Sequence, residues 1–130
     1  MKIPFFHKKD KILVVEDSDT LSKAINTKLQ TYEFDVLIAK SADQAIGVLK
    51  KNKDIKIVWL DHWLRDHSDG LTVLKYIREQ SEFDDIPVFI VSASGDEMRK
   101  QYMDMGATKF YVKSDHLMTE LVEEMIGFLK

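Results

Sequence analysis

The chain has 130 residues, enough for one ordinary domain but not for two, and its lack of cysteine excludes disulfide scaffolds, thiolate zinc sites and cysteine nucleophiles. Its 19 Lys and Arg against 22 Asp and Glu give a formal charge of -3, which disfavours direct binding to nucleic acid. No apolar run approaches the roughly 18 residues that a membrane span requires, so we expect a cytoplasmic globular protein without membrane contacts.

Short apolar runs begin just after residues 1–10, which we expect to form an N-terminal extension, with residues 11–130 forming the domain. The runs are continuous rather than alternating, as expected of parallel strands that are covered on both faces. They occupy residues 12–15, 36–39, 55–60, 88–91 and 110–112.

Apolar residues recur at helical spacing after each run. The five stripes are Leu21, Ile25, Leu29 and Tyr32; Ala42, Ala45, Ile46 and Leu49; Leu71, Leu74 and Ile77; Met98, Tyr102 and Met105; and Leu117, Leu121, Met125 and Phe128. Ser41 with Gln44 predicts a capping box at the second helix, and Ser114 predicts the cap of the last. Five strand–helix units predict an α/β fold, a parallel sheet with helices on both faces.

Polar residues terminate four of the five apolar runs. Glu16 and Asp17 follow the first run, Asp61 the third, Ser92 the fourth and Lys113 the fifth. Any one of them alone is more typical of a solvated turn residue or a helix cap. Ligands of open parallel sheets bind at the carboxyl ends of the strands, so the whole set favours one site at that rim.

Three carboxylates at one rim repel one another unless a cation lies among them. An all-oxygen cluster without histidine favours a hard divalent ion, Mg²⁺ first. The charges of the three acids, a divalent ion and Lys113 then cancel, and the metal also offsets a dianionic phosphoryl group carried on one aspartate. The residues therefore predict a Mg²⁺-dependent site that carries a phosphoryl group.

Four motifs in order give the chain its resemblance to the receiver domain of two-component response regulators, over about residues 11–130. They are Val14-Val15-Glu16-Asp17-Ser18; Leu60-Asp61-His62-Trp63-Leu64 with Asp69-Gly70; Val91-Ser92-Ala93; and Gly106-Ala107 followed by Phe110-Tyr111-Val112-Lys113. The resemblance implies a flavodoxin-like receiver fold, with a five-stranded parallel sheet in the order 2-1-3-4-5 and five helices on both faces.

The resemblance also implies how the site binds metal and phosphate. Asp61 would be the phosphoacceptor, a carboxylate nucleophile that attacks phosphorus. Mg²⁺ would be bound by Asp17 and Asp61 directly, by Glu16 through water and by the backbone carbonyl of Trp63.

Three further residues acquire roles from the same resemblance. Lys113 would contact the phosphoryl oxygens, Ser92 would donate its hydroxyl to them, and Phe110 would be the aromatic switch. The phosphoryl group would come from a histidine kinase or phosphotransfer protein, since no glycine-rich nucleotide loop is present. Residues 95–130 would contact a downstream target or effector domain, or a second copy of the chain in a homodimer.

The chain departs from the usual family pattern around the acceptor. Arg65 and Ser114 stand where the family commonly has proline, and the loop from Asp61 to Gly70 is one residue longer than usual. A cis Lys113–Ser114 bond would cost ~2.5–4 kcal/mol, which leaves a trans bond or a strained cis bond held by the site.

Three further side chains in that loop, those of Trp63, His62 and His67, lead to separate hypotheses. Trp63 would screen the acyl phosphate from water and slow self-dephosphorylation, or else pack flat on the loop. His62 and His67 are expected to be solvated loop residues rather than ligands of a transition metal.

Two alternatives compete with the phosphorylated receiver. A phosphate-independent pseudo-receiver, acting only as a protein-binding module, typically lacks one or more of the site residues, and all are intact here. An aspartate-nucleophile phosphatase of the haloacid dehalogenase type needs a second aspartate where Trp63 stands. We therefore expect no enzyme beyond one that promotes its own phosphorylation and dephosphorylation.

Overall fold

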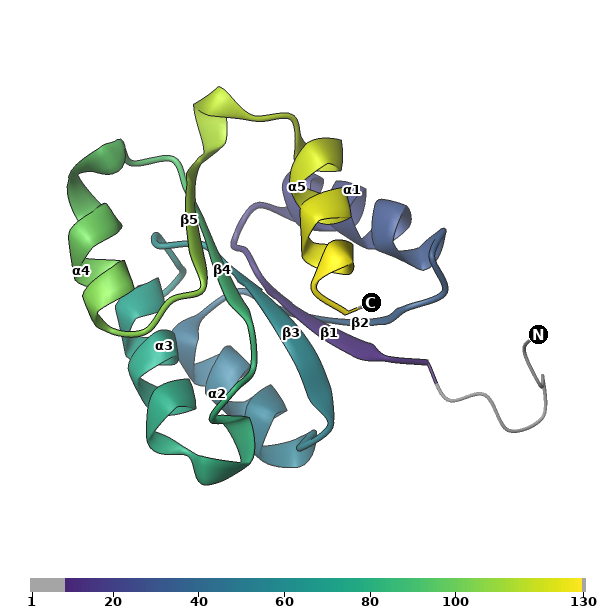
Figure 1. Ribbon diagram of the computed structural model, residues 1–130, viewed down its shortest axis with the longest axis horizontal. Coiled ribbons are helices and arrows are strands. Elements are labelled where there is room, and N and C mark those ends of the chain that lie inside the picture. The colour runs from purple at the N-terminus through teal and green to yellow at the C-terminus, as the bar shows by residue number, and fades with distance from the viewer. Residues whose placement is uncertain (1–8, 130) are drawn as a thin grey trace.

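A single parallel sheet forms the centre of the computed structural model, which describes residues 9–129. The strands are β1 (Lys11–Val15), β2 (Asp35–Ala39), β3 (Ile55–Leu60), β4 (Val88–Ser92) and β5 (Lys109–Val112). Their order is β2-β1-β3-β4-β5, which confirms the predicted sheet (Figure 1). Each strand lies within one residue of its apolar run. The N-terminal extension of residues 1–10 lies mostly outside the described residues and stays a prediction.

Helices cover both faces of this sheet. They are α1 (Asp19–Gln30), α2 (Ala42–Lys51), α3 (Gly70–Glu79), α4 (Arg99–Asp104) and α5 (Met118–Gly127). α1 and α5 lie on one face, whereas α2, α3 and α4 lie on the other (Figure 1). None of the helices within residues 9–129 is both long and apolar enough to cross a membrane.

Two buried clusters explain why the strands are continuously apolar. Ile12 and Val14 of β1 pack toward α1 and α5, whereas Leu13 and Val15 pack toward α2, α3 and α4. Because side chains alternate across a strand, burial of both faces leaves few positions for polar residues, and those within the strands, such as Lys56 of β3, are exposed near the strand starts. Polar residues therefore collect where the strands end.

Helix α2 begins largely as predicted. The Ser41 hydroxyl accepts a hydrogen bond from the N–H of Gln44 at 3.1 Å, which confirms the N-cap. The side chain of Gln44 accepts instead from the N–H of Lys40, at 2.8 Å. Only the serine half of the predicted capping box therefore forms.

Helix α5 begins later than predicted, and the proposed cap at Ser114 is wrong. Ser114 lies inside a 3₁₀ turn, Lys113–Asp115, after a trans Lys113–Ser114 bond. The chain then extends to Leu117, whose N–H donates to the Glu120 carboxylate at 2.9 Å. Leu117 is therefore the N-cap residue of α5, and 68 % of its surface is exposed to solvent. It is not the core residue that the helical stripe predicted. Phe128, from the same stripe, is also exposed, at 43 %.

Candidate metal centre

The sheet register brings the acids of β1 and β3 together. Val15 pairs with Leu60, so Glu16 and Asp61 follow adjacent strand ends. The N–H of Asp61 donates to the Val15 carbonyl at 2.9 Å. One carboxylate oxygen from each of Glu16, Asp17 and Asp61 lies within 4.8 Å of the others. The three acids that sequence reasoning grouped therefore share one pocket of oxygen donors.

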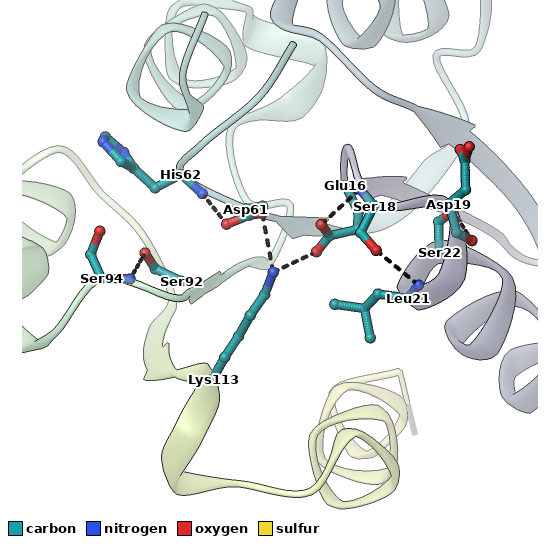
Figure 2. A network of polar contacts seen from close by, with 10 residues as sticks. All are labelled: Glu16, Ser18, Asp19, Leu21, Ser22, Asp61, His62, Ser92, Ser94 and Lys113. Carbon is teal, nitrogen blue, oxygen red and sulfur yellow. Dashed lines mark hydrogen bonds and ion pairs between the residues drawn. The ribbon is translucent and has the colours of Figure 1, made fainter.

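Lys113 reaches this cluster from the end of β5. Its Nζ lies 2.9 Å from Glu16 Oε1 and 3.1 Å from Asp61 Oδ2 (Figure 2). The Glu16 and Asp61 side chains are almost fully buried, whereas that of Lys113 is partly exposed. One ammonium therefore bridges two buried carboxylates.

Burial and crowding change the acidity of these groups. Burial, followed by the charge of Asp61, raises the pKa of Glu16 from 4.5 to about 7, although Lys113 and the N–H of Ser18 oppose the rise. Burial alone would lower the pKa of Lys113, but its hydrogen bond to Glu16 and the charge of Asp61 outweigh burial and raise it. Lys113 therefore stays protonated, and Glu16 exchanges its proton near neutral pH.

His62 orients the Asp61 carboxylate, and the expectation that this histidine is solvated is wrong. The backbone N–H of His62 donates to Asp61 Oδ1 at 2.7 Å (Figure 2). Its side chain is buried, and Nδ1 lies 2.6 Å from the hydroxyl of Tyr102 on α4. Residues 58 and 60 face α2, α3 and α4, and the same alternation carries residue 62 toward α4. The alternation of buried positions along β3 was the signal in the sequence that could have revealed the burial of His62.

Trp63 forms a bridge between two loops rather than lying flat on its own. Its Nε1–H donates to Ser94 Oγ at 2.8 Å, while 58 % of the residue's surface stays exposed. The N–H of Ser94 in turn donates to Ser92 Oγ at 3.1 Å (Figure 2). Ser92 is the last residue of β4 and is fully buried. Ser94 follows the fourth apolar run, two residues after Ser92, but nothing in the sequence indicated its bond to Trp63.

Phe110 faces inward against α4. It is buried, with its ring centroid 5.8 Å from that of Tyr102. The guanidinium of Arg99 lies 5.1 Å from the ring centroid and donates to the Phe110 carbonyl at 2.9 Å. Sequence reasoning identified Phe110 but missed Arg99, because their contact depends on how α4 packs beside β5.

Arg65 ties the loop after Asp61 to two neighbouring segments of the chain. The N–H of Arg65 donates to the Lys40 carbonyl at 3.0 Å, a bond that proline at this position would not form. The Arg65 guanidinium also donates to the Asp17 carbonyl at 3.2 Å. Within the loop, Asp66 and His67 adopt left-handed backbone angles, with φ of 63° and 56°.

Comparisons with known proteins agree with this architecture. Residues 12–124 match the response regulator receiver domain family. A chemotaxis protein CheY homologue of Campylobacter jejuni is 30% identical over 121 residues, 90% of this chain and 92% of the relative. The non-phosphorylated HemR receiver domain of Leptospira biflexa is 28% identical, with a TM-score of 0.78 over 91% of this chain and 94% of that one. The chemotaxis protein CheY4 of Vibrio cholerae, 21% identical, shares the fold with a TM-score of 0.81 over 92% and 98%.

Proposed function

The chain belongs to the response regulator receiver domain family, and on that premise we propose that it accepts a phosphoryl group on Asp61 in a Mg²⁺-dependent reaction. The observation that carries the proposal is the contact of Lys113 Nζ with Asp61 Oδ2, beside two further carboxylates. The alternative pseudo-receiver does not need this set, whereas an acyl phosphate needs every member of it.

The donor set fits Mg²⁺. Glu16, Asp17 and Asp61 offer only oxygen ligands within 4.8 Å of one another, as a hard divalent ion requires. The backbone carbonyl of Trp63 would complete the protein ligands. When bound, Mg²⁺ would offset the negative charge of the carboxylates and of the phosphoryl group.

Asp61 is held in a geometry that suits nucleophilic attack. The His62 N–H holds Oδ1, and Lys113 lies at Oδ2. An oxygen of Asp61 would attack the phosphorus of a phosphohistidine; the new P–O bond forms as the P–N bond breaks, and its electron pair returns to the imidazole. Lys113 would contact the charged phosphoryl oxygens, and the Ser92 hydroxyl would donate to them.

The partners follow from this chemistry. The donor would be a histidine kinase or phosphotransfer protein, and a downstream protein would bind the surface of residues 95–130, beneath which Phe110 is buried. The domain would change only its own phosphorylation state and would turn over no separate substrate.

Incubation with acetyl phosphate and Mg²⁺, followed by intact mass measurement, tests the proposal. We expect the mass gain of one phosphoryl group, and none when a chelator removes the metal. No mass gain and no Mg²⁺ binding would instead favour the pseudo-receiver. Sustained release of inorganic phosphate from small esters would favour the phosphatase.

The raised pKa of Glu16 predicts pH-dependent metal binding. As the pH falls from about 8 to about 6, a proton comes to occupy Glu16, which lies beside Asp61, Asp17 and Lys113, and removes one negative charge from the site. Mg²⁺ affinity therefore falls by up to about tenfold per pH unit below the pKa of about 7. We expect the Mg²⁺-induced rise in Tm to be larger at about pH 8 than at about pH 6.

In the metal-free protein, protonation of Glu16 has the opposite effect: it stabilises the fold. Because the folded pKa of Glu16 is raised from 4.5 to about 7, its contribution to stability is complete below pH 4.5 and is lost as pH rises through 7. The Glu16→Gln variant is the control, and it should flatten both pH dependences. Equal Mg²⁺-induced shifts at both pH values in the unmodified protein would contradict the assignment.

Because the Trp63 indole would screen phosphorylated Asp61 from water, we expect the phosphoryl group to be lost slowly. The Trp63→Ala variant removes both the indole and its bond to Ser94, admits water to Asp61, and should shorten the phosphoryl half-life by about tenfold, or ~1.4 kcal/mol of barrier. The Trp63→Phe variant keeps an aromatic ring without the N–H, so it separates bulk from the bridge. An unchanged half-life in Trp63→Ala would contradict the screening role.

A further inference from the structure

Tyr102 connects helix α4 to the residue that follows the phosphoacceptor. It is the one buried residue within α4, and its exposed fraction is 0%. Its hydroxyl lies 2.6 Å from His62 Nδ1, and the two rings meet edge to face with centroids 5.6 Å apart. These side chains are 40 residues apart in sequence. A buried hydrogen bond therefore joins two elements that share no backbone ladder.

The Tyr102 hydroxyl also lies where the loop from Asp61 to Gly70 closes. The Gly70 N–H donates to the His62 carbonyl at 2.9 Å. A Cβ on Gly70 would lie only 2.6 Å from the Tyr102 hydroxyl and 2.5 Å from the Asp61 carbonyl. Only glycine leaves room for the hydroxyl here, so Tyr102 packs directly against the point where the loop closes.

The Tyr102 hydroxyl donates this hydrogen bond when the neutral imidazole carries its proton on Nε2. Burial, followed by the charges of Asp69 and Asp61, raises the pKa of Tyr102 far above its ordinary value, so the proton stays on the oxygen. On the other side, the backbone N–H of His62 donates to Asp61 Oδ1 at 2.7 Å. A continuous path runs from α4 through Tyr102 and His62 to the acceptor carboxylate.

We propose that Tyr102 is a positioning residue for the phosphoacceptor site: its hydrogen bond to His62 holds the loop that carries Asp61 and Trp63 in the metal-binding arrangement. The inference rests on the proposed function. Because coupling between two sites is reciprocal, binding of Mg²⁺ and a phosphoryl group at Asp61 then depends on the position of α4, and α4 responds to that binding. Phe110, which packs against Tyr102, lies on the same connection.

A double-mutant cycle on the affinity for beryllofluoride with Mg²⁺ tests the proposal. Tyr102→Phe removes only the hydroxyl, and His62→Leu removes its partner. Each change should weaken binding about fivefold, the range expected for one buried hydrogen bond. The double variant should also be about fivefold weaker, whereas independent effects would multiply to about 25-fold.

Two further variants separate positioning from general stability. His62→Asn places an amide near the position of Nδ1 and should restore most of the affinity. Tyr111→Phe removes a hydroxyl from a buried tyrosine on the opposite face of the sheet and should bind as the unmodified protein does. The Tm of each variant is measured in parallel.

Different outcomes would contradict the positioning role of Tyr102 and the phosphorylation of Asp61. Beryllofluoride affinity that is unchanged in Tyr102→Phe, even with a lower Tm, would overturn the positioning role. Effects that multiply in the double variant would overturn it too. An unmodified protein that binds no beryllofluoride would overturn the proposed function as well.

Discussion

The Asp61→Asn variant is expected to lose phosphorylation completely while remaining folded. The amide lacks the anionic oxygen that would attack phosphorus, and the change also removes one of the three carboxylates that would hold the metal. Intact mass after treatment with acetyl phosphate and Mg²⁺ should show no phosphoryl adduct. Because the charge of Asp61 helps to raise the pKa of Glu16, we also expect that pKa to fall in the variant.

A matched control lies in the same loop. Asp66→Asn makes the same chemical change at an exposed acid that lies outside the cluster, and the variant should be phosphorylated like the unmodified protein. A phosphoryl adduct that persists in Asp61→Asn would show that another residue is the acceptor. Loss of the adduct in both variants would point instead to a loop that no longer closes.

The Lys113→Met variant is expected to lower the rate of phosphorylation by about 10²-fold or more, the typical effect of removing one group that stabilises developing charge. Methionine keeps the unbranched shape of the side chain up to the ε position but lacks the ammonium. It leaves Glu16 and Asp61 together without the cation that now lies 2.9 Å from one and 3.1 Å from the other. Initial rates of adduct formation from acetyl phosphate measure the loss.

The same variant should be less stable in a pH-dependent way. Removing one partner of a buried ion pair costs about 3 kcal/mol. The pKa of Glu16 rises further once Lys113 no longer opposes it, so protonation relieves the repulsion and the deficit shrinks as the pH falls. Urea unfolding of the metal-free variant, at acidic and at neutral pH, measures both effects.

Lys109→Met provides the comparison, because this lysine is exposed on the same strand. It should change neither the rate of phosphorylation nor the free energy of unfolding appreciably. A Lys113→Met variant that is phosphorylated at the normal rate would remove Lys113 from the chemistry. An unchanged free energy of unfolding in Lys113→Met would show that the Lys113 ammonium does not stabilise the buried Glu16 and Asp61 carboxylates.

Much of the architecture was predictable because the information is local. Continuous apolar runs predict buried parallel strands, and residues that follow a run are at the carboxyl rim whichever way the helices pack. Glu16, Asp17 and Asp61 could therefore be grouped from their places in the sequence alone. The strand order came from the resemblance, and the sheet confirms it.

Contacts between side chains that are distant in sequence were decided only by the tertiary structure. The hydrogen bonds of Trp63 to Ser94 and of His62 to Tyr102 depend on the rotamers and separation of packed elements, to within fractions of an ångström. The start of α5 at Met118 likewise depends on a 3₁₀ turn after Lys113, which local capping rules did not reveal. Periodicity and strand ends determine which residues share a face or a rim, whereas the choice of partner among them depends on the packing of the whole domain, because a hydrogen bond is short and directional.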